Sequence, residues 1–418
     1  MGKIKKIKAR QVFDSRGYPT IETEVLLEDG SIGRSIVPSG ASTGSYEAHE
    51  LRDKSDDYLN KSVFKAVKNV NTTINNKLIN EDSLEQENID SLLINLDGTE
   101  NKSNLGANAI LSVSIANCKA AALNQKKEIF QYLNKKNEYG LPYPLLNIIN
   151  GGAHANNSLN IQEFMIRPDG AKSFEECMQF AFLTIQNLKK KLEKKKLNTS
   201  VGDEGGFAPS LESDEEALDL ILESIESAGF KPGIDISLCL DVASNELFDG
   251  KNYSIISGKK INSKELINYY TDLVKKYPIK SIEDPIFEDD WEVWSNLTGS
   301  IGDSVQIVGD DLFVTNENRL KKGIEQKSAN AILIKLNQIG TVSETLKTID
   351  LAQKEKFNTI ISHRSGDTED TFIADLAIAT NSNQIKTGSL ARSERVSKYN
   401  RLLKIEEMTN FPGMTGLQ

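Results

Sequence analysis

Six charged residues stand at the ends of predicted strands in the second half of the chain, where they could carry acid–base chemistry at a metal site. Each follows a short apolar run, and the six are Asp241, Glu283, Asp310, Lys335, His363 and Lys386. After a first interval of 42 residues they recur every 23 to 28 residues, which fits one strand, one helix and two short loops. In a closed parallel barrel the carboxyl ends of the strands meet at one rim, where active sites are built. The pattern therefore predicts that three carboxylates, two lysines and a histidine converge.

The three carboxylates are oxygen ligands of the kind that Mg²⁺ prefers. A single acid after a strand is as often a cap for the next helix, but three on successive strands favour a metal site. The neighbouring Asp284 and Asp311 should point away from the rim, because side chains alternate along a strand, and we expect them in supporting roles. Lys335 and Lys386 can act as bases beside a metal or form structural ion pairs with the acids.

Three further segments carry reactive side chains that have simpler alternative interpretations. Glu204 lies between glycines in VGDEGGFAP, and His154 and Glu163 lie in INGGAHANNSLNIQEF. Arg364 and Ser365 stand on a turn before a predicted helix, which is a suitable place for an anion. The alternatives are an ordinary turn, a solvent-bonded histidine and a helix cap. Residues 40–44, GASTG, lack the lysine of a phosphate-binding loop and are more typical of a mobile lid.

The elements that must position these residues form two predicted domains in an α/β chain. Residues 3–37 alternate apolar and polar side chains around Asp29-Gly30, which predicts a three-stranded antiparallel meander. Residues 56–135 are mostly helical, so residues 1–135 are expected to form an α+β cap domain. From residue 140 to 418 strands alternate with amphipathic helices, and about eight strands favour a β/α barrel. LLNIINGG and NIQEFMIRP are close enough to form a hairpin, so the second barrel strand should be antiparallel.

Composition narrows the class of protein further. A net charge of −10 argues against general affinity for nucleic acid, and no apolar run is long enough to span a membrane. The basic N-terminus lacks the apolar core of a secretory signal. Three cysteines without a CxxC pair are expected to be free buried thiols in a reducing compartment. The sequence thus predicts a cytoplasmic protein.

Ten segments, in order from about residue 9 to 407, resemble the enolase (phosphopyruvate hydratase) family. They are FDSRG, PSGASTG, LGANAILSVSIA, NGGAHANNSLNIQEFM, VGDEGGFAP, LDVASNE, SIEDPIFEDDWEVW, IVGDDL, SHRSGDTEDTFIADL and IKTGSLARSERVSKYNRLLKIEE. The resemblance implies a glycolytic and gluconeogenic lyase that dehydrates 2-phosphoglycerate reversibly to phosphoenolpyruvate. It also implies two Mg²⁺ ions per active site, a TIM-like barrel, and a homodimer or an octamer of four dimers.

The resemblance also implies roles for individual residues. Asp241, Glu283 and Asp310 are similar to the ligands of the first Mg²⁺, and Ser42 to a ligand of the second, substrate-dependent ion. Lys335 resembles the general base, Glu204 the general acid and Glu163 the partner of that acid. The remaining substrate contacts would be His154 and His363 beside the substrate, Lys386 at its carboxylate, and Arg364 with Ser365 at its phosphate.

Two departures and three alternative functions accompany the resemblance. Tyr18 replaces a usual asparagine, and Asp367 replaces a usual glutamate. We expect Asp367 to cap the following helix rather than to bond the GASTG lid. The alternatives are a non-catalytic scaffold, a racemase or acid-sugar dehydratase of the same superfamily, and a secondary binding role beside catalysis. Arg364-Ser365 and GASTG argue against the second, and the retained acid, base and metal ligands argue against the first.

Overall fold

A computed structural model describes residues 2–41, 43–134, 139–256, 259–409 and 413–417. The chain begins with a three-stranded antiparallel sheet in the order β1–β2–β3, as predicted. Its strands are β1 (Ile4–Phe13), β2 (Pro19–Leu27) and β3 (Ile32–Ile36). The turn between β2 and β3 contains Asp29, whose carboxylate accepts the N–H of Ser31, and Gly30, whose φ is +91°. The sheet thus forms where the apolar alternation and the turn residues indicate.

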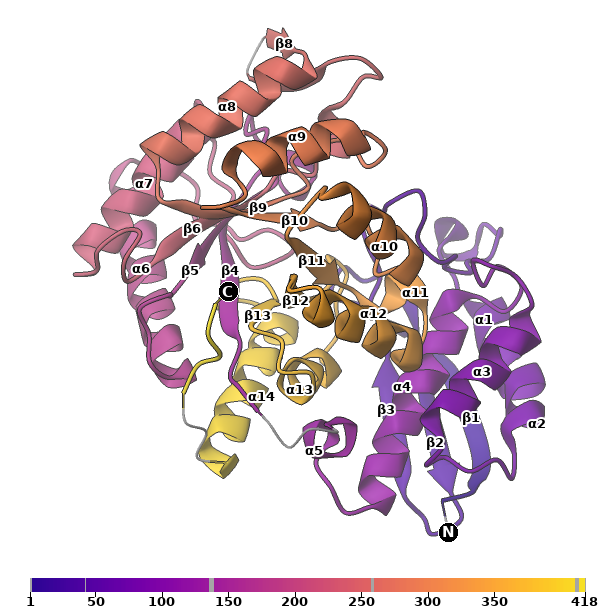
Figure 1. Cartoon of the computed structure of the whole chain (residues 1–418). Helices are drawn as coiled ribbons and strands as arrows, with labels where there is room; N and C mark the ends of the chain where they lie inside the picture. Colours follow the sequence, from indigo (N-terminus) through magenta and orange to yellow (C-terminus); the bar gives the residue numbers. More distant parts are fainter. Residues whose placement is uncertain (1, 42, 135–138, 257–258, 410–412, 418) are drawn as a thin grey trace.

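Helices cover this sheet, and one of them is buried along most of its length. They are α1 (Phe64–Asn69), α2 (Asn75–Leu78), α3 (Gln86–Asp97), α4 (Ala107–Asn124) and α5 (Ile129–Leu133), with the short turns η1 (Asp57–Asn60) and η2 (Val70–Ile74). The small residues of α4 let it lie directly on β2 and β3. A Cβ on Gly33 would come within 1.9 Å of the carbonyl oxygen of Ala116, so glycine is required at this crossing. Figure 1 shows this sheet-and-helix region, in indigo and purple, beside the barrel.

Eight strands close into a barrel in the order β10–β11–β12–β13–β4–β5–β6–β9. They are β4 (Tyr143–Asn150), β5 (Glu163–Arg167), β6 (Ser237–Asp241), β9 (Ile279–Glu283), β10 (Gln306–Gly309), β11 (Ala331–Ile334), β12 (Asn358–Ser362) and β13 (Gln384–Lys386). β5 pairs antiparallel with both neighbours, whereas the other pairs are parallel. The predicted barrel and its antiparallel second strand are confirmed. β7 (Tyr253–Ile256) and β8 (Lys259–Ile261) form a separate hairpin.

Amphipathic helices surround the barrel (Figure 1). They are α6 (Phe174–Lys194), α7 (Asp214–Ser227), α8 (Ser263–Lys276), α9 (Trp291–Ile301), α10 (Glu317–Gln326), α11 (Leu336–Ile339), α12 (Val342–Lys354), α13 (Phe372–Ala379) and α14 (Ser393–Thr409), with turns η3 (Gly152–His154) and η4 (Ser244–Leu247). Side-chain caps begin many of them. Ser173, Ser213 and Thr341 each accept a backbone N–H three residues later, which satisfies donors that helix starts leave free.

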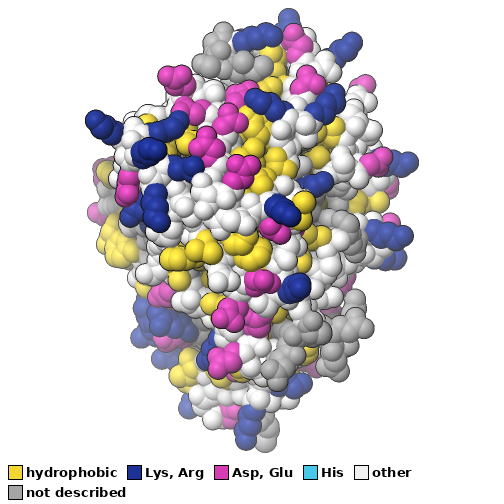
Figure 2. Space-filling model, turned by 90° about the vertical axis from the view of Figure 1, so that its left-hand side faces the viewer, with side chains coloured by type: hydrophobic (Ala, Val, Ile, Leu, Met, Phe, Trp, Pro, Cys, Tyr) yellow, Lys and Arg dark blue, Asp and Glu magenta, His cyan; other side chains and the backbone are white. Residues whose placement is uncertain are grey.

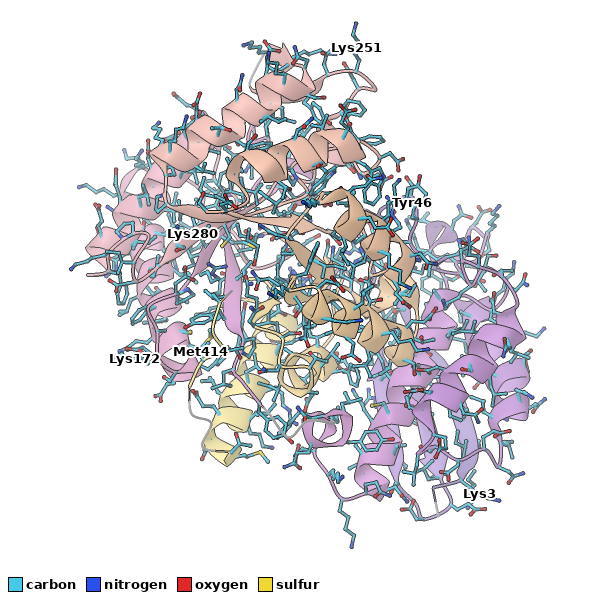
Figure 3. The ribbon with its side chains drawn as sticks, in the orientation of Figure 1. Lys3, Tyr46, Lys172, Lys251, Lys280 and Met414 are labelled. Atoms are coloured by element: carbon cyan, nitrogen blue, oxygen red, sulfur yellow. The ribbon has the colours of Figure 1, made fainter. Side chains whose placement is uncertain are left out.

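Buried polar contacts join the first region to the barrel. Lys119 of α4 donates to Asp370 at 2.7 Å, and Asp90 of α3 accepts the N–H of Ser343 at 2.9 Å. Tyr46, labelled in Figure 3 where the two regions meet, donates to Asp289 of the barrel at 3.0 Å. The contact of Tyr46 ties the loop that carries it to one end of the barrel.

The outer surface carries both signs of charge. On the face shown in Figure 2, acidic and basic side chains are interspersed among small apolar patches. The three cysteines, Cys118, Cys177 and Cys239, are free and buried, as predicted. Among the described helices, none has both the length and the apolar character needed to cross a membrane.

Candidate active site

The barrel brings all six predicted strand-end residues to one rim. Asp241, Glu283 and Lys386 are the last residues of β6, β9 and β13, and Asp310, Lys335 and His363 come directly after β10, β11 and β12. Except for the partly buried Lys335, each of the six is at most 7% exposed. The rim surrounds a cavity of about 20 Å³, which is room for about one water molecule. The pattern of strand ends therefore located this cluster correctly.

Glu163 reaches the same rim because β5 runs against its neighbours. As the first residue of an antiparallel strand, it pairs with Asp241, the last residue of β6. The other end of β5, Arg167, pairs with Ser237 at the opposite end of the barrel. One reversed strand thus adds an acid at its start to a rim otherwise built from strand ends.

Lys386 lies at the centre of three carboxylates. Its Nζ is 2.8 Å from Asp241 Oδ2, 2.8 Å from Glu283 Oε2 and 3.1 Å from Glu163 Oε1. Burial disfavours its charge, but these acids outweigh burial and raise the pKa of Lys386 well above its usual value. Lys386 is therefore a fixed cation, suited to holding an anion and unsuited to accepting a proton.

Lys335 has a different environment, with one principal partner. It forms an ion pair with Asp310, whose other oxygen accepts a hydrogen bond of 2.8 Å from Gln338 Nε2. Burial lowers the pKa of Lys335, but Asp310 outweighs it and the pKa is raised. The raised pKa of Lys335 therefore depends chiefly on one acid, whereas that of Lys386 depends on three.

The carboxylates at the rim fit a divalent cation. Burial and the charges of Asp241 and Asp310 raise the pKa of Glu283 well above its usual value, which shows that these acids repel one another. The three acids here whose oxygens lie within 4.8 Å of one another are Asp284, Asp310 and Asp311. Asp241 and Glu283, from the predicted set, are instead paired with Lys386. Such mutual repulsion is relieved by a hard cation with oxygen ligands.

Asp284 and Asp311 do not point away from the rim as predicted, because both line the same cavity as Asp310. Asp284 also supports this arrangement through the backbone. Its two oxygens accept the N–H groups of Asp310 and Asp311 at 2.9 and 2.8 Å. Its own φ is +42°, an unusual value for a residue with a side chain. The turn after β9 thereby fixes the turn after β10, from which Asp310 faces the cavity.

Glu163 and Glu204 form a buried pair beside two histidines. His154 Nδ1 lies 3.6 Å from Glu163 and 3.8 Å from Glu204, and His363 Nε2 lies 3.5 Å from Glu204. Burial and the charge of Glu204 raise the pKa of Glu163 well above its usual value. Burial opposes ionisation of Glu204, but the ring nitrogens of His363 and His154 that face it and the charge of Arg395 outweigh burial and hold its pKa well below the usual value. Of the two carboxylates, Glu204 is therefore the one that ionises more readily.

Arg364 and Ser365 lie at the mouth of the cavity with residues from distant segments. Arg364 donates to Glu47 at 2.9 and 3.1 Å and to Asn337 Oδ1 at 2.9 Å. The Ser365 hydroxyl lies 3.4 Å from His154 Nε2. A second cavity of about 260 Å³ adjoins this corner, lined by residues of the loop 37–50, the start of α4 and Asn337. Glu47 balances the charge of Arg364 here, and the adjoining cavity has space for a group that would compete with that carboxylate.

Two predicted features need separate comment. Ser42, expected as a metal ligand, lies outside the described residues. Asp367 does not cap α13, which begins five residues later at Phe372 with Thr371 as N-cap. Its carboxylate instead forms a buried ion pair with Lys398 at 3.1 Å. The capping prediction is wrong because the loop extends further than the sequence pattern indicated.

Sequence reasoning missed several residues that touch the predicted ones, including Asn147, which donates to Glu204 at 3.2 Å. Glu47 and Asn337 hold Arg364, Gln338 holds Asp310, and Arg395 of α14 donates to His363 Nδ1 at 2.5 Å. Gln338 and Asn337 lie in the segment LNQIG directly after Lys335, and their nearness to a predicted base was an available signal. Glu47 and Arg395 come from remote segments, where no local pattern marks them.

Comparisons with known proteins agree along the whole chain. Residues 138–413 match the family model described as "Enolase, C-terminal TIM barrel domain", and residues 4–133 match "Enolase, N-terminal domain". The chain is 61% identical over 408 residues to a protein named "Enolase" from Pelagibacter ubique (strain HTCC1062), and the match covers 97% of each chain.

Proposed function

The chain belongs to the enolase family, the phosphopyruvate hydratases, and we propose that it converts 2-phospho-D-glycerate reversibly to phosphoenolpyruvate with Lys335 as base and Glu204 as acid. The observation that carries this proposal is the pairing of two proton-handling groups around one small cavity. Lys335 lies at the end of β11 beside Asp310, and Glu204 lies with Glu163 beside the two histidines. A reaction that removes one proton and delivers another needs such a pair.

Lys335 would remove the proton next to the substrate carboxylate. This proton is very weakly acidic, and its removal places additional negative charge on the carboxylate. Lys386, kept charged by Asp241, Glu163 and Glu283, is suited to stabilising that charge from a fixed position. Lys335 must be uncharged to serve as base, which requires that a cation engage Asp310.

Glu204 would protonate the departing hydroxide. Hydroxide is a poor leaving group, and a positioned acid lowers the cost of its departure. The pKa of Glu204 lies well below its usual value in the ligand-free protein, so Glu204 must receive a proton before it can act as the acid. His154 approaches both carboxylates, at 3.6 and 3.8 Å, and is placed to assist that transfer.

The substrate phosphate would bind at the mouth of the cavity. Arg364 offers a guanidinium, Ser365 a hydroxyl, and Lys335 and Lys386 add positive charge deeper in the rim. Glu47 holds Arg364 in the ligand-free protein, so a bound phosphate would have to share or displace that carboxylate. Because Glu47 also accepts the N–H of Gly44, phosphate binding would be felt by the loop above the cavity.

Two Mg²⁺ ions would complete the site. Asp241, Glu283 and Asp310 would hold the first, and Ser42 is proposed for the second, with the substrate. Bound there, Mg²⁺ supplies electrostatic stabilisation of the charge that develops on the substrate carboxylate. We also propose that the protein acts in glycolysis and gluconeogenesis in the cytoplasm, as a homodimer or octamer. The same proposal divides the chain into domains of residues 1–135 and 140–418. The two family matches support that division, because one ends at residue 133 and the next begins at 138.

A non-catalytic scaffold or a different dehydratase of the superfamily is less well supported. The acid, the base and the three proposed metal ligands on described residues are all retained, and Arg364 with Ser365 suits a phosphorylated substrate. The test is an absorbance assay for phosphoenolpyruvate formed from 2-phosphoglycerate, with Mg²⁺ and after chelation. We expect Mg²⁺-dependent product. Its absence with Mg²⁺ present would overturn the proposal.

A further inference from the structure

The environment of His363 differs from that of His154, although both approach Glu204. His363 Nδ1 lies 2.5 Å from Arg395 Nη1, and a guanidinium can only donate a hydrogen bond. His363 Nδ1 must therefore carry a lone pair and no proton. His154 has no comparable constraint, since its hydroxyl partner on Ser365 can donate or accept.

Arg395 is itself held in one position. It is fully buried on α14, and its two terminal nitrogens also donate to the carbonyl oxygens of Arg364, Ser365 and Asp203 at 2.6 to 3.1 Å. These carbonyls belong to the two loops that carry His363 and Glu204. The guanidinium thus has little freedom to rotate away from His363, and both loops are fixed to it.

A neutral imidazole without a proton on Nδ1 carries it on Nε2. His363 Nε2 is buried, makes no hydrogen bond among the described residues, and faces Glu204 Oε1 at 3.5 Å. We propose that Arg395 is a positioning residue that fixes His363 as the uncharged Nε2–H tautomer, so that His363 can donate to Glu204 or the leaving hydroxyl but cannot accept a proton from either. The role of this donor in dehydration rests on the proposed function, whereas the tautomer itself does not.

The charged groups around His363 favour the same state. Burial lowers the pKa of His363, Glu204 raises it, and Arg395, Lys386 and Lys335 lower it further, so that it lies well below its usual value. Glu204 lies on the loop before α7, Arg395 on α14, and the two lysines at the ends of β13 and β11. Three cations thus oppose a charge on His363, while one carboxylate favours it. His363 therefore does not compete with the leaving hydroxide for the proton of Glu204.

The tautomer can be read directly, because the chain contains only three histidines. The protein is labelled with ¹⁵N-histidine, and long-range ¹H–¹⁵N spectra of the ring nitrogens are recorded without substrate. A His363→Gln variant assigns the signals, and the exposed His49 provides a reference. We expect the Nδ1 of His363 to resonate as an unprotonated nitrogen and Nε2 as a protonated one. A protonated Nδ1 would overturn the proposal, whatever the substrate of the enzyme.

Two variants and a matched control test the assignment to Arg395. Arg395→Met removes the donor and should shift His363 toward the Nδ1–H tautomer. Arg395→Lys keeps a cation and a donor and should retain Nε2–H. Lys398→Met is the control: Lys398 is a buried cation one turn along α14 that donates to Asp367 and to backbone carbonyls, without a contact to His363. It should lower stability and leave the tautomer unchanged.

Kinetics separate positioning from a structural role. With 2-phosphoglycerate, Arg395→Met should lower kcat about 10- to 100-fold, with a smaller change in KM, and Arg395→Lys should recover most of the loss. A purely structural role would alter the loop of Arg364 and raise KM without moving the tautomer. An unchanged Nε2–H tautomer in Arg395→Met would therefore overturn the proposal. Should that variant fail to fold, the wild-type and Arg395→Lys spectra still decide the tautomer.

Discussion

The two ends of the barrel are both polar, but they differ in how fully their polar atoms are paired. At the end opposite the rim, Gln306 donates to Ser281 at 2.9 Å and exchanges hydrogen bonds with Gln384, which also accepts from Arg167 at 3.0 Å. At the rim, buried atoms of His154, Glu163, Gln162 and His363 make no hydrogen bond among the described residues. Unpaired buried polar atoms cost stability. The end around Gln306 is the more fully paired and serves the fold, although Asn383 Oδ1 beside Gln384 has no partner among the described residues. The rim is where a ligand would contribute.

Removing the proposed base should give the largest effect at the rim. Lys335→Ala should lower turnover by about 10²–10⁴-fold, because general base catalysis typically contributes that much. Exchange of the substrate's α-proton with deuterated water should be lost as well, which can be followed by NMR. The exposed Lys354→Ala on α12 is the control and should match the wild type. Exchange at a near wild-type rate in Lys335→Ala would place the base elsewhere.

Replacing the proposed acid, Glu204, should separate removal of the α-proton from departure of the hydroxide. Glu204→Gln keeps the size of the side chain but cannot deliver a proton, so product formation should fall by about 10²–10⁴-fold. Proton exchange, which needs Lys335 alone, should persist at a measurable fraction of the wild-type rate. Equal loss of exchange and product would show that the two steps are not separable in this site.

Replacing a proposed metal ligand should change both the Mg²⁺ requirement and the stability of the rim. Asp310→Asn removes one negative charge from a group that includes Asp284 and Asp311. It should raise the Mg²⁺ concentration needed for half-maximal activity by about tenfold or more. The melting temperature of the Mg²⁺-free protein should fall, because the change leaves the buried charge of Lys335 without its principal partner. Asp303→Asn, an exposed acid at the opposite end of the barrel, should change neither quantity. An unchanged Mg²⁺ titration in Asp310→Asn would contradict its proposed role as a ligand.

The sequence predicted the rim better than its surroundings, for a physical reason. Parallel strands of similar length end at one edge, so a recurring charge after an apolar run locates Asp241 or Lys386 without any tertiary information. The rim position of Glu163 depends on the reversed direction of β5, which the short loop of a hairpin indicated. Arg395 and Glu47 act across long sequence separations, and only the fold brings them to the site. Asp367 was misplaced because the start of α13 depends on the packing of the loop before it.

The smallest expected effect on activity lies at the more fully paired end of the barrel, where stability should change instead. Gln306→Leu would leave the amide N–H group of Gln384 and the hydroxyl of Ser281 without their present partners. Stranding buried polar groups costs about 1–3 kcal/mol of unfolding free energy, measurable by urea denaturation. Lys280→Gln, at an exposed position on β9 (Figure 3), is the control and should stay within about 0.5 kcal/mol of the wild type. Gln306 lies four residues before Asp310, and none of its described hydrogen bonds reaches a rim residue. The kcat of Gln306→Leu should therefore stay within about twofold of the wild-type value, because the contacts to the transition state are unchanged. A large loss of kcat without a loss of stability would mean that the two ends are coupled through β10, and the division between them would fail.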